Sequence, residues 1–116
     1  MDDFVHLMKS IVSGLNVVGL PYNPAEPNAC LAAENLRQEL KKQGIKLIEM
    51  PVYASSDVLQ VAEAFADKGV DAFAVSADNT VYVAFDSMAK IAGERHIPLF
   101  VTEPSLLYLK PDFRSI

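Results

Sequence analysis

The chain alternates between two apolar periodicities, and this alternation constrains its fold more than any other feature. Short apolar runs typical of buried strands occupy residues 15–20, 45–50, 70–75 and 97–102. A stretch with apolar residues at helical spacing precedes each run. Strands joined by single helices run parallel, because each crossover returns the chain to the same edge of the sheet. The sequence therefore predicts a parallel α/β sheet.

The predicted fold is one α/β domain over residues 1–116, a three-layer sandwich of the Rossmann or flavodoxin type. Four parallel strands are expected in the order 2-1-3-4, with helices on both faces. The switch point, where ligands bind in such folds, then lies between the first and third strands. The fourth helix is expected to run unbroken from Thr80 to Arg95, and Ser55 or Ser56 to cap the third helix.

The end of the chain, from residue 104 to 116, is less regular but carries several apolar side chains. They are Leu106, Leu107, Leu109 and Phe113. We expect them to lie at the edge of the fourth strand, where they would cover exposed backbone. Because such an edge also favours pairing with another chain, a symmetric homodimer through the tail or this edge is expected.

Two polar loops follow the first and third strands. One is Pro21-Tyr-Asn-Pro-Ala-Glu-Pro-Asn28 and the other is Ser76-Ala-Asp-Asn-Thr80. Both open on the same edge of the predicted sheet, and the second begins a helix, where backbone N–H groups attract anions. A simpler interpretation is that Asp78 or Asn79 only caps that helix. Taken together, the two loops favour a ligand-binding site.

Composition argues against several classes of partner. The formal charge of −5 and a pI near 4.8 are unfavourable for nucleic acids or anionic membranes, which attract a basic face. The lone Cys30 provides no disulfide framework, and His6 and His96 lie too far apart for a zinc motif. No apolar run approaches the roughly 20 residues of a membrane span, and the start lacks the pattern of a secretory signal.

Enzymatic and cofactor-binding functions of this fold require residues that the loops lack. A phospho-acceptor domain needs an acidic pair after the first strand, where Tyr22 and Asn23 stand. Neither a P-loop nor a dinucleotide-binding glycine motif is present, and the first loop has no Ser or Thr to hold a flavin phosphate. No Ser or Cys is predicted beside a histidine. We expect no catalytic residues, no metal and no cofactor.

Several segments resemble one known family in their order and spacing from about residue 3 to residue 104. They are Val17-Val-Gly-Leu-Pro-Tyr-Asn-Pro-Ala-Glu-Pro-Asn28, Pro51-Val52, Ser55-Ser-Asp-Val58, Val70-Asp-Ala-Phe73, Ser76-Ala-Asp-Asn-Thr80 and, after Lys90-Ile-Ala92, Ile97-Pro-Leu-Phe100. They resemble solute-binding proteins of ABC transporters, in the group associated with aromatic amino acid uptake. The two polar motifs are fairly specific in combination.

The resemblance implies one lobe of a two-lobed, type 1 periplasmic-binding-protein fold. It also implies a transporter permease as partner, and a periplasmic or lipid-anchored location for the parent protein; this chain itself shows no signal peptide and is expected to be an excised lobe or a truncated relative. The residues that match the family's three binding loops are Tyr22, Asn23, Glu26 and Asn28, then Asp78, Asn79 and Thr80, then Glu103 and Pro104.

The implied ligand is an amino acid, with aromatic ones favoured. Asp78 or Glu103 would bind its ammonium, and the helix start at Asn79 and Thr80 would donate to its carboxylate. Tyr22 or Tyr82 could form an aromatic wall, although Tyr82, beside the apolar stripe of its helix, is better explained as a packing residue. The alternative function is a stand-alone regulatory or oligomerisation module without a transport role.

Overall fold

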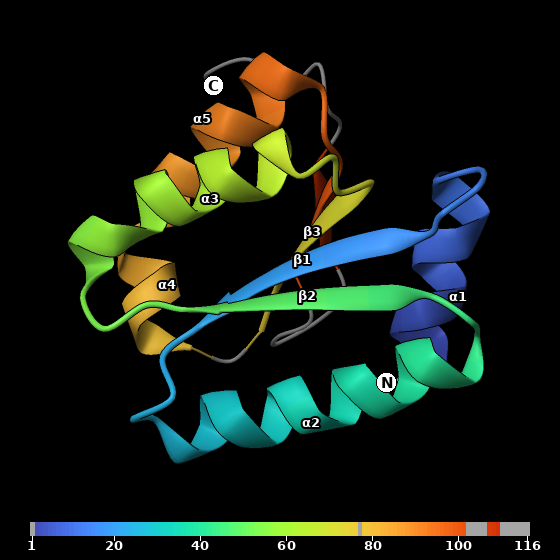
Figure 1. Cartoon of the computed structure of the whole chain (residues 1–116), viewed down its shortest axis with the longest axis horizontal. Coiled ribbons are helices and arrows are strands. Elements are labelled where there is room, and N and C mark those ends of the chain that lie inside the picture. Colours follow the sequence, from blue (N-terminus) through green and yellow to red (C-terminus); the bar gives the residue numbers. More distant parts are fainter. Residues whose placement is uncertain (1, 77, 102–106, 110–116) are drawn as a thin grey trace.

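A single mixed sheet with the strand order β2-β1-β3-β4-β5 forms the centre of the molecule (Figure 1). The computed structural model describes residues 2–76, 78–101 and 107–109 of the chain. The strands are β1 (Val17–Tyr22), β2 (Lys46–Pro51), β3 (Ala72–Val75), β4 (Leu99–Val101) and β5 (Leu107–Leu109). The first four pair in parallel, which confirms the predicted order 2-1-3-4.

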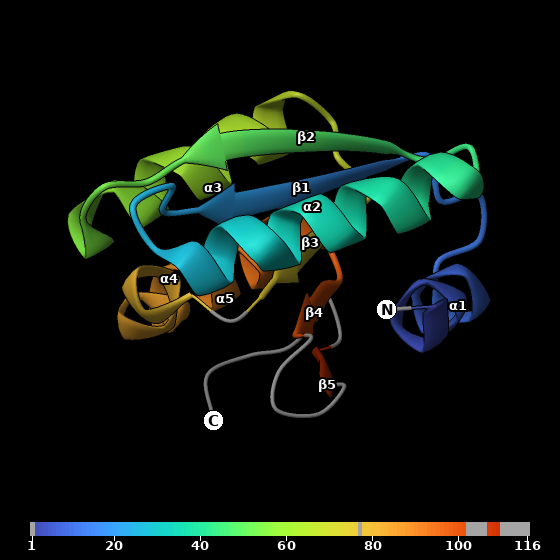
Figure 2. The same cartoon turned by 90° about the horizontal axis from the view of Figure 1, so that it is seen from below.

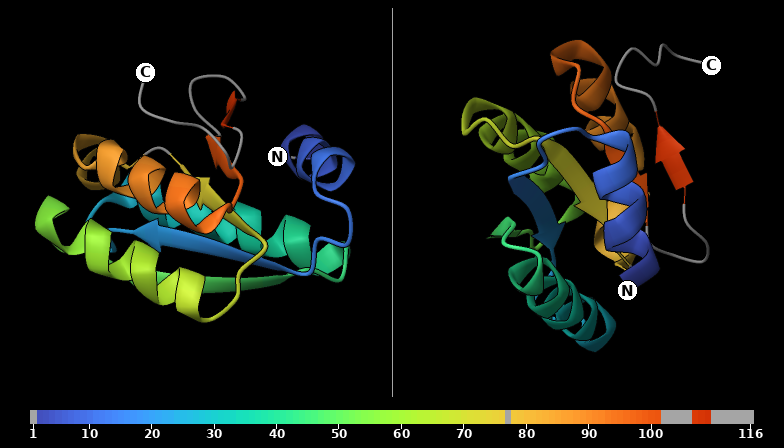
Figure 3. Two further views of the ribbon diagram at one scale, coloured as in Figure 1. Left: turned by 90° about the horizontal axis from the view of Figure 1, so that it is seen from above. Right: turned by 90° about the vertical axis from the view of Figure 1, so that its right-hand side faces the viewer.

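Helices cover both faces of the sheet (Figures 1 and 3). They are α1 (Asp2–Ile11), α2 (Pro27–Lys42), α3 (Val58–Asp67), α4 (Asn79–Val83) and α5 (Phe85–Arg95), with a 3-10 turn η1 (Ser55–Asp57) before α3. One buried cluster lies on the α1 and α2 side and includes Met8, Leu20 and Phe100. The other lies on the α3 and α5 side and includes Phe65 and Phe73. The three predicted layers are therefore present.

The carboxyl ends of β1 and β2 point to one edge of the sheet, where α4 and the start of α2 also lie (Figure 2). Val17 accepts a hydrogen bond from the N–H of Asp71, next to β3, so alternate β1 residues, Gly19 and Pro21, face β3. The pairing of β1 with β3 extends only to Gly19 and Phe73. Because Pro21 has no N–H to offer β3, the ladder ends there, and the two strands separate at the switch point.

The prediction of an unbroken fourth helix is wrong, because the helix is interrupted at Ala84. This residue has φ −107° and ψ 27°, and its N–H donates to the carbonyl of Val81. The two pieces pack on different elements: α4 contacts β1 and η1, whereas α5 contacts α3 and β4. The break lets each piece bury its own apolar residues, of which Val81 and Met88 are fully buried.

The edge of β4 is covered by β5, which pairs with it in antiparallel orientation, with Leu99 opposite Leu109. The expectation that the tail covers a sheet edge is thus confirmed for residues 107–109, and the fold has a fifth strand that the sequence did not predict. Leu106 and Phe113 lie outside the described residues. An open β4 edge is therefore not available for a dimer.

The opposite edge of the sheet, β2, is poorly suited to pairing. The N–H groups of Lys46 and Val52 donate toward β1, so the alternate positions 47, 49 and 51 face outward. Pro51 has no N–H at one of these positions, and the guanidinium of Arg37 binds the carboxylate of Glu49 through two nitrogens, each at 2.7 Å. Charged side chains and proline are devices that protect an edge strand from aggregation.

Candidate functional site

The two polar loops meet at the carboxyl edge of the sheet, where the side chain of Asp78 joins them. Its Oδ2 accepts the N–H of Asn23 at 2.7 Å, and its Oδ1 accepts the N–H of Val81 at 3.0 Å. Asp78 is 1% exposed and is the N-cap of α4. The interpretation of Asp78 as a cap is therefore confirmed, and the same carboxylate also holds the first loop.

Glu26 makes a second connection between the loops. Its Oε1 accepts the N–H of Asn79 at 3.0 Å, and its Oε2 accepts the N–H and the hydroxyl of Thr80 at 3.2 and 2.6 Å. The amide of Asn23 also donates to the Thr80 hydroxyl at 3.0 Å. The N–H groups expected to bind a ligand carboxylate are thus already bonded to Glu26, which such a ligand would have to displace.

The two carboxylates differ in their affinity for a proton. The hydrogen bond from the Thr80 hydroxyl lowers the pKa of Glu26 below its usual range, and the backbone N–H groups of Asn79 and Thr80 add to this effect. Burial raises the pKa of Asp78, and the negative charge of Glu26 acts in the same direction. Among the described residues, neither carboxylate belongs to a salt bridge. The loops therefore present negative charge at the crevice.

The other predicted residues occupy different environments. Tyr22 ends β1 and is partly buried beside the core on the α1 and α2 side. Asn28 is exposed in the first turn of α2, and the side chain of Asn79 is exposed at the start of α4. Tyr82 is partly buried against the α3 and α5 core, which favours a packing role. Glu103 and Pro104 lie outside the described residues.

The loop after β2 also reaches this edge, although the sequence analysis predicted no binding residue in it. The carboxylate of Asp57 accepts the N–H groups of Tyr53 and Ala54 at 3.1 and 3.2 Å, so it, rather than Ser55 or Ser56, fixes the start of η1 and α3. Tyr53 is 69% exposed. The only signal for Tyr53 in the sequence was its place three positions after the predicted strand 45–50.

Ser76, directly after β3, is the second residue that sequence reasoning did not single out. It is 1% exposed, and its hydroxyl oxygen has no hydrogen-bond partner among the described residues.

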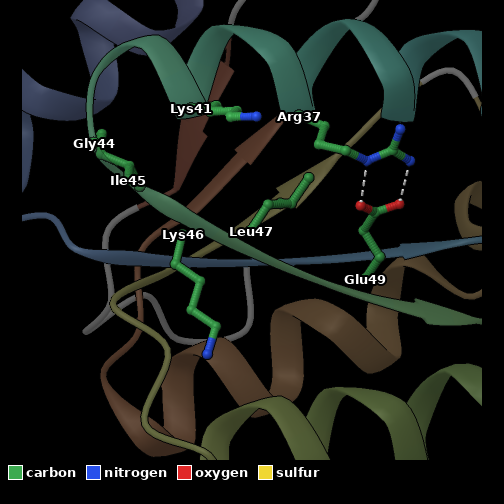
Figure 4. Close-up of a pocket in the computed structure, with 7 residues that line it drawn as sticks. All are labelled: Arg37, Lys41, Gly44, Ile45, Lys46, Leu47 and Glu49. Atoms are coloured by element: carbon green, nitrogen blue, oxygen red, sulfur yellow. Dashed lines mark hydrogen bonds and ion pairs between the residues drawn. The ribbon is translucent and has the colours of Figure 1, made fainter.

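A separate pocket of about 390 Å³ lies between α2 and β2 (Figure 4). It is lined by Arg37, Lys41, Gly44, Ile45, Lys46, Leu47 and Glu49. Most of these residues belong to the end of α2 and the start of β2, so the pocket is remote from the two polar loops. The side chains of Lys41 and Lys46 do not converge in it (Figure 4).

The described residues contain no group of three His, Cys, Asp or Glu side chains arranged to hold a metal ion. None of the described helices is both long enough and apolar enough to span a membrane. The predictions that no metal, flavin or nucleotide accompanies the chain remain predictions.

Comparison with known proteins identifies related chains. The Tyrosine-binding protein of Clostridioides difficile is 26% identical over 103 residues, which cover 89% of this chain and 30% of that protein. The structure of a conserved domain protein from Vibrio cholerae O1 biovar El Tor has a TM-score of 0.83 and 34% identity, and the match covers 89% of this chain and 34% of that one.

Two further solved structures share the fold. A ligand-free, open substrate binding protein with adhesive properties from Clostridium difficile has a TM-score of 0.82 and 28% identity, covering 87% of this chain and 34% of that one. An ABC domain from Streptococcus pneumonia in complex with L-Trp has a TM-score of 0.82, covering 89% and 35%; at 19% identity this likeness concerns the fold alone.

The chain spans 30% to 35% of the length of these relatives. Residues 1–108 match the family described as ABC transporter substrate binding protein. The match covers both polar loops and every strand of the parallel sheet, and it confirms the resemblance seen in the sequence. The chain belongs to the ABC transporter substrate binding protein family.

Proposed function

We propose that this chain is one lobe of a substrate-binding protein and that it binds an amino acid, with aromatic ones favoured. The observation that carries the proposal is the meeting of two polar loops at the point where β1 and β3 separate. In an open α/β sheet, this crevice is where ligands bind. A second lobe would close over the ligand and exclude water from the other side.

The chemistry of the loops suits a zwitterion. Glu26 and Asp78 supply negative charge for the ammonium, Glu26 being the more accessible of the two. The exposed amides of Asn28 and Asn79 lie on the same edge and are available to donate to the ligand carboxylate. We retain Tyr22, Asn23 and Thr80 as members of the site, since they position these groups. Glu103, which the resemblance places in a third loop, remains a proposed ligand for the ammonium.

The preference for an aromatic ligand rests on a relative. A protein that is 26% identical to this chain over 103 residues bears the name Tyrosine-binding protein. That relationship supports an aromatic amino acid as the first ligand to test. By the same reasoning from the family, the partners proposed for the complete protein are a transporter permease and a second lobe, and its proposed location is outside the cytoplasm.

The test is a titration of the 116-residue chain with L-tryptophan. Because the chain contains no tryptophan, indole fluorescence comes from the ligand alone, and amide NMR shifts locate the binding. Only one side of the ligand is covered by this lobe, so we expect millimolar affinity, about −4 kcal/mol, with shifts at Asn23 and Asn79.

A pair of variants controls the titration. Asn79→Ala removes an exposed amide but keeps the backbone N–H that Glu26 binds, and it is expected to weaken the binding of L-tryptophan. Asn35→Ala removes a similarly exposed amide from the middle of α2 and should leave the binding unchanged. If L-tryptophan, L-phenylalanine and L-tyrosine cause no saturable shift in the wild-type chain, the proposed function is wrong.

A further inference from the structure

The exposed large apolar side chains are unevenly distributed. Four described residues of this kind are exposed: Ile11, Leu31, Tyr53 and Val83, at 37%, 59%, 69% and 77%. Ile11 ends α1, whereas the three more exposed residues follow the carboxyl ends of β1, β2 and β3 within ten positions. Apolar surface thus accumulates toward the edge that carries the polar loops.

Tyr53 lies next to the polar loops because of the pairing of β2 with β1. The N–H of Val52 donates to the carbonyl of Tyr22 at 2.9 Å, so the chain leaves the sheet at Tyr53 directly beside the loop that begins at Asn23. The turn η1, which follows Tyr53, contacts α4, and Figure 1 shows the loop after β2 beside α4. Tyr53 therefore leaves the sheet beside the first polar loop, which carries Glu26, and the turn that follows it contacts α4, which begins at Asn79.

The backbone at Tyr53 is held in place while its ring is left in solvent. The carboxylate of Asp57 accepts the N–H groups of both Tyr53 and Ala54, and Val52 is fully buried. A tyrosine on a fixed backbone has few rotatable bonds to immobilise, so it loses little entropy when a ligand covers it. The other tyrosines with described side chains, Tyr22 and Tyr82, are already partly buried against the cores.

We propose that the ring of Tyr53 forms the aromatic wall of the binding crevice and contacts the side chain of the amino acid ligand. This inference rests on the proposed function and names the residue that would make the site prefer aromatic ligands. Aromatic rings in offset-stacked or edge-to-face contact attract each other beyond the area that they bury. Truncation of Tyr53 should therefore weaken the binding of aromatic ligands more than the binding of aliphatic ones.

The test uses the 116-residue chain with L-phenylalanine and L-leucine as probes, and amide NMR shifts at Asn79 as the readout. Tyr53→Ala is expected to weaken the binding of L-phenylalanine about fivefold, or about 1 kcal/mol. The affinity for L-leucine should stay within about twofold of the wild-type value. Tyr53→Phe, which keeps the ring, should bind L-phenylalanine like the wild type. Leu31→Ala, which truncates another exposed apolar side chain, on α2, should have no effect on either probe.

A second readout detects contact directly. In a chain labelled with fluorotyrosine, the Tyr53 signal is identified as the one lost in Tyr53→Phe, and it should shift with L-phenylalanine. If the wild type binds L-phenylalanine but Tyr53→Ala binds it equally well, the inference is wrong while the proposed function stands. If the wild type binds no amino acid, both the inference and the proposed function fail.

Discussion

Glu26 and Asp78 link the two loops with charges that respond to pH in opposite directions. Glu26 has a lowered pKa, so its ionised form stabilises the fold above the usual glutamate value of 4.5, and this stabilisation is lost as the pH falls through its folded pKa. Asp78 has a raised pKa, so its contribution is fully present below the usual aspartate value of 3.8 and is lost as the pH rises through its folded pKa. The two effects oppose each other in mild acid.

We predict that Glu26→Gln lowers the free energy of unfolding by about 1 kcal/mol at neutral pH, because a charged acceptor of three hydrogen bonds is lost. The variant should also lose less stability than the wild type on acidification below about pH 4.5. Asp78→Asn, if it folds, should lose more stability on acidification than the wild type. Urea denaturation at several pH values measures these slopes. Glu63→Gln, at an exposed site on α3, is the control; an equal effect there would contradict the assignment.

The residues of the site could be predicted only in part. The sequence indicated both loops, and Asn23, Glu26, Asp78 and Thr80 do lie in one network. It could not indicate that Glu26 binds the start of α4, because the residues that bond lie 53 and 54 positions apart. Tyr53 was missed for a similar reason. Its exposure depends on how the chain turns into η1, and the sequence indicates a helix start at Ser55-Ser-Asp57 without indicating which side chain the turn leaves in solvent.

Long helices and strands could be predicted from the spacing of their apolar residues, whereas the short elements depend on packing against the rest of the fold. The parallel strands and most helices were predictable, because each buries one face at a regular spacing. The break at Ala84 was not, since the apolar period continues across it and neither glycine nor proline marks it. Likewise β5, only three residues long, exists as a strand because β4 offers it an edge.

Strand β1 and helix α3 approach each other so closely that only glycine fits between them. A Cβ built on Gly19 would lie 2.8 Å from the ring of Phe65. That ring is fully buried and is 6.2 Å from the ring of Phe73, so it has little room to move. The small residue in β1 thus sets the distance between the sheet and α3.

We therefore predict that Gly19→Ala lowers the free energy of unfolding by about 1–3 kcal/mol, because the added methyl group overpacks the core. Urea denaturation measures the loss. Combining it with Phe65→Leu, which makes space at the contact, should give less than the sum of the two single losses. Strict additivity of the two substitutions would show that the contact with Phe65 does not limit position 19.

At the scale of the molecule, the sheet has two outer strands with different capacities for association. On β2, Pro51 and the Arg37–Glu49 pair protect the edge. Strand β5 covers β4 but is itself the last strand of the sheet in the order observed. The homodimer expected from the sequence remains a proposal, and of its two expected contacts, the tail and the edge of β4, the pairing of β4 with β5 leaves the tail.

We predict that the 116-residue chain forms a symmetric dimer at micromolar concentration through the β5 side of the sheet, since β5 is the last strand among the described residues and an outer strand favours pairing with a second copy. Sedimentation velocity gives the oligomeric state, and amide hydrogen exchange gives the location. The outward-facing amides of Leu47 and Glu49 on β2 should exchange rapidly in the dimer, because that edge stays open. A monomer at these concentrations would contradict the prediction, as would a dimer that protects the β2 amides, which would place the contact on the opposite edge.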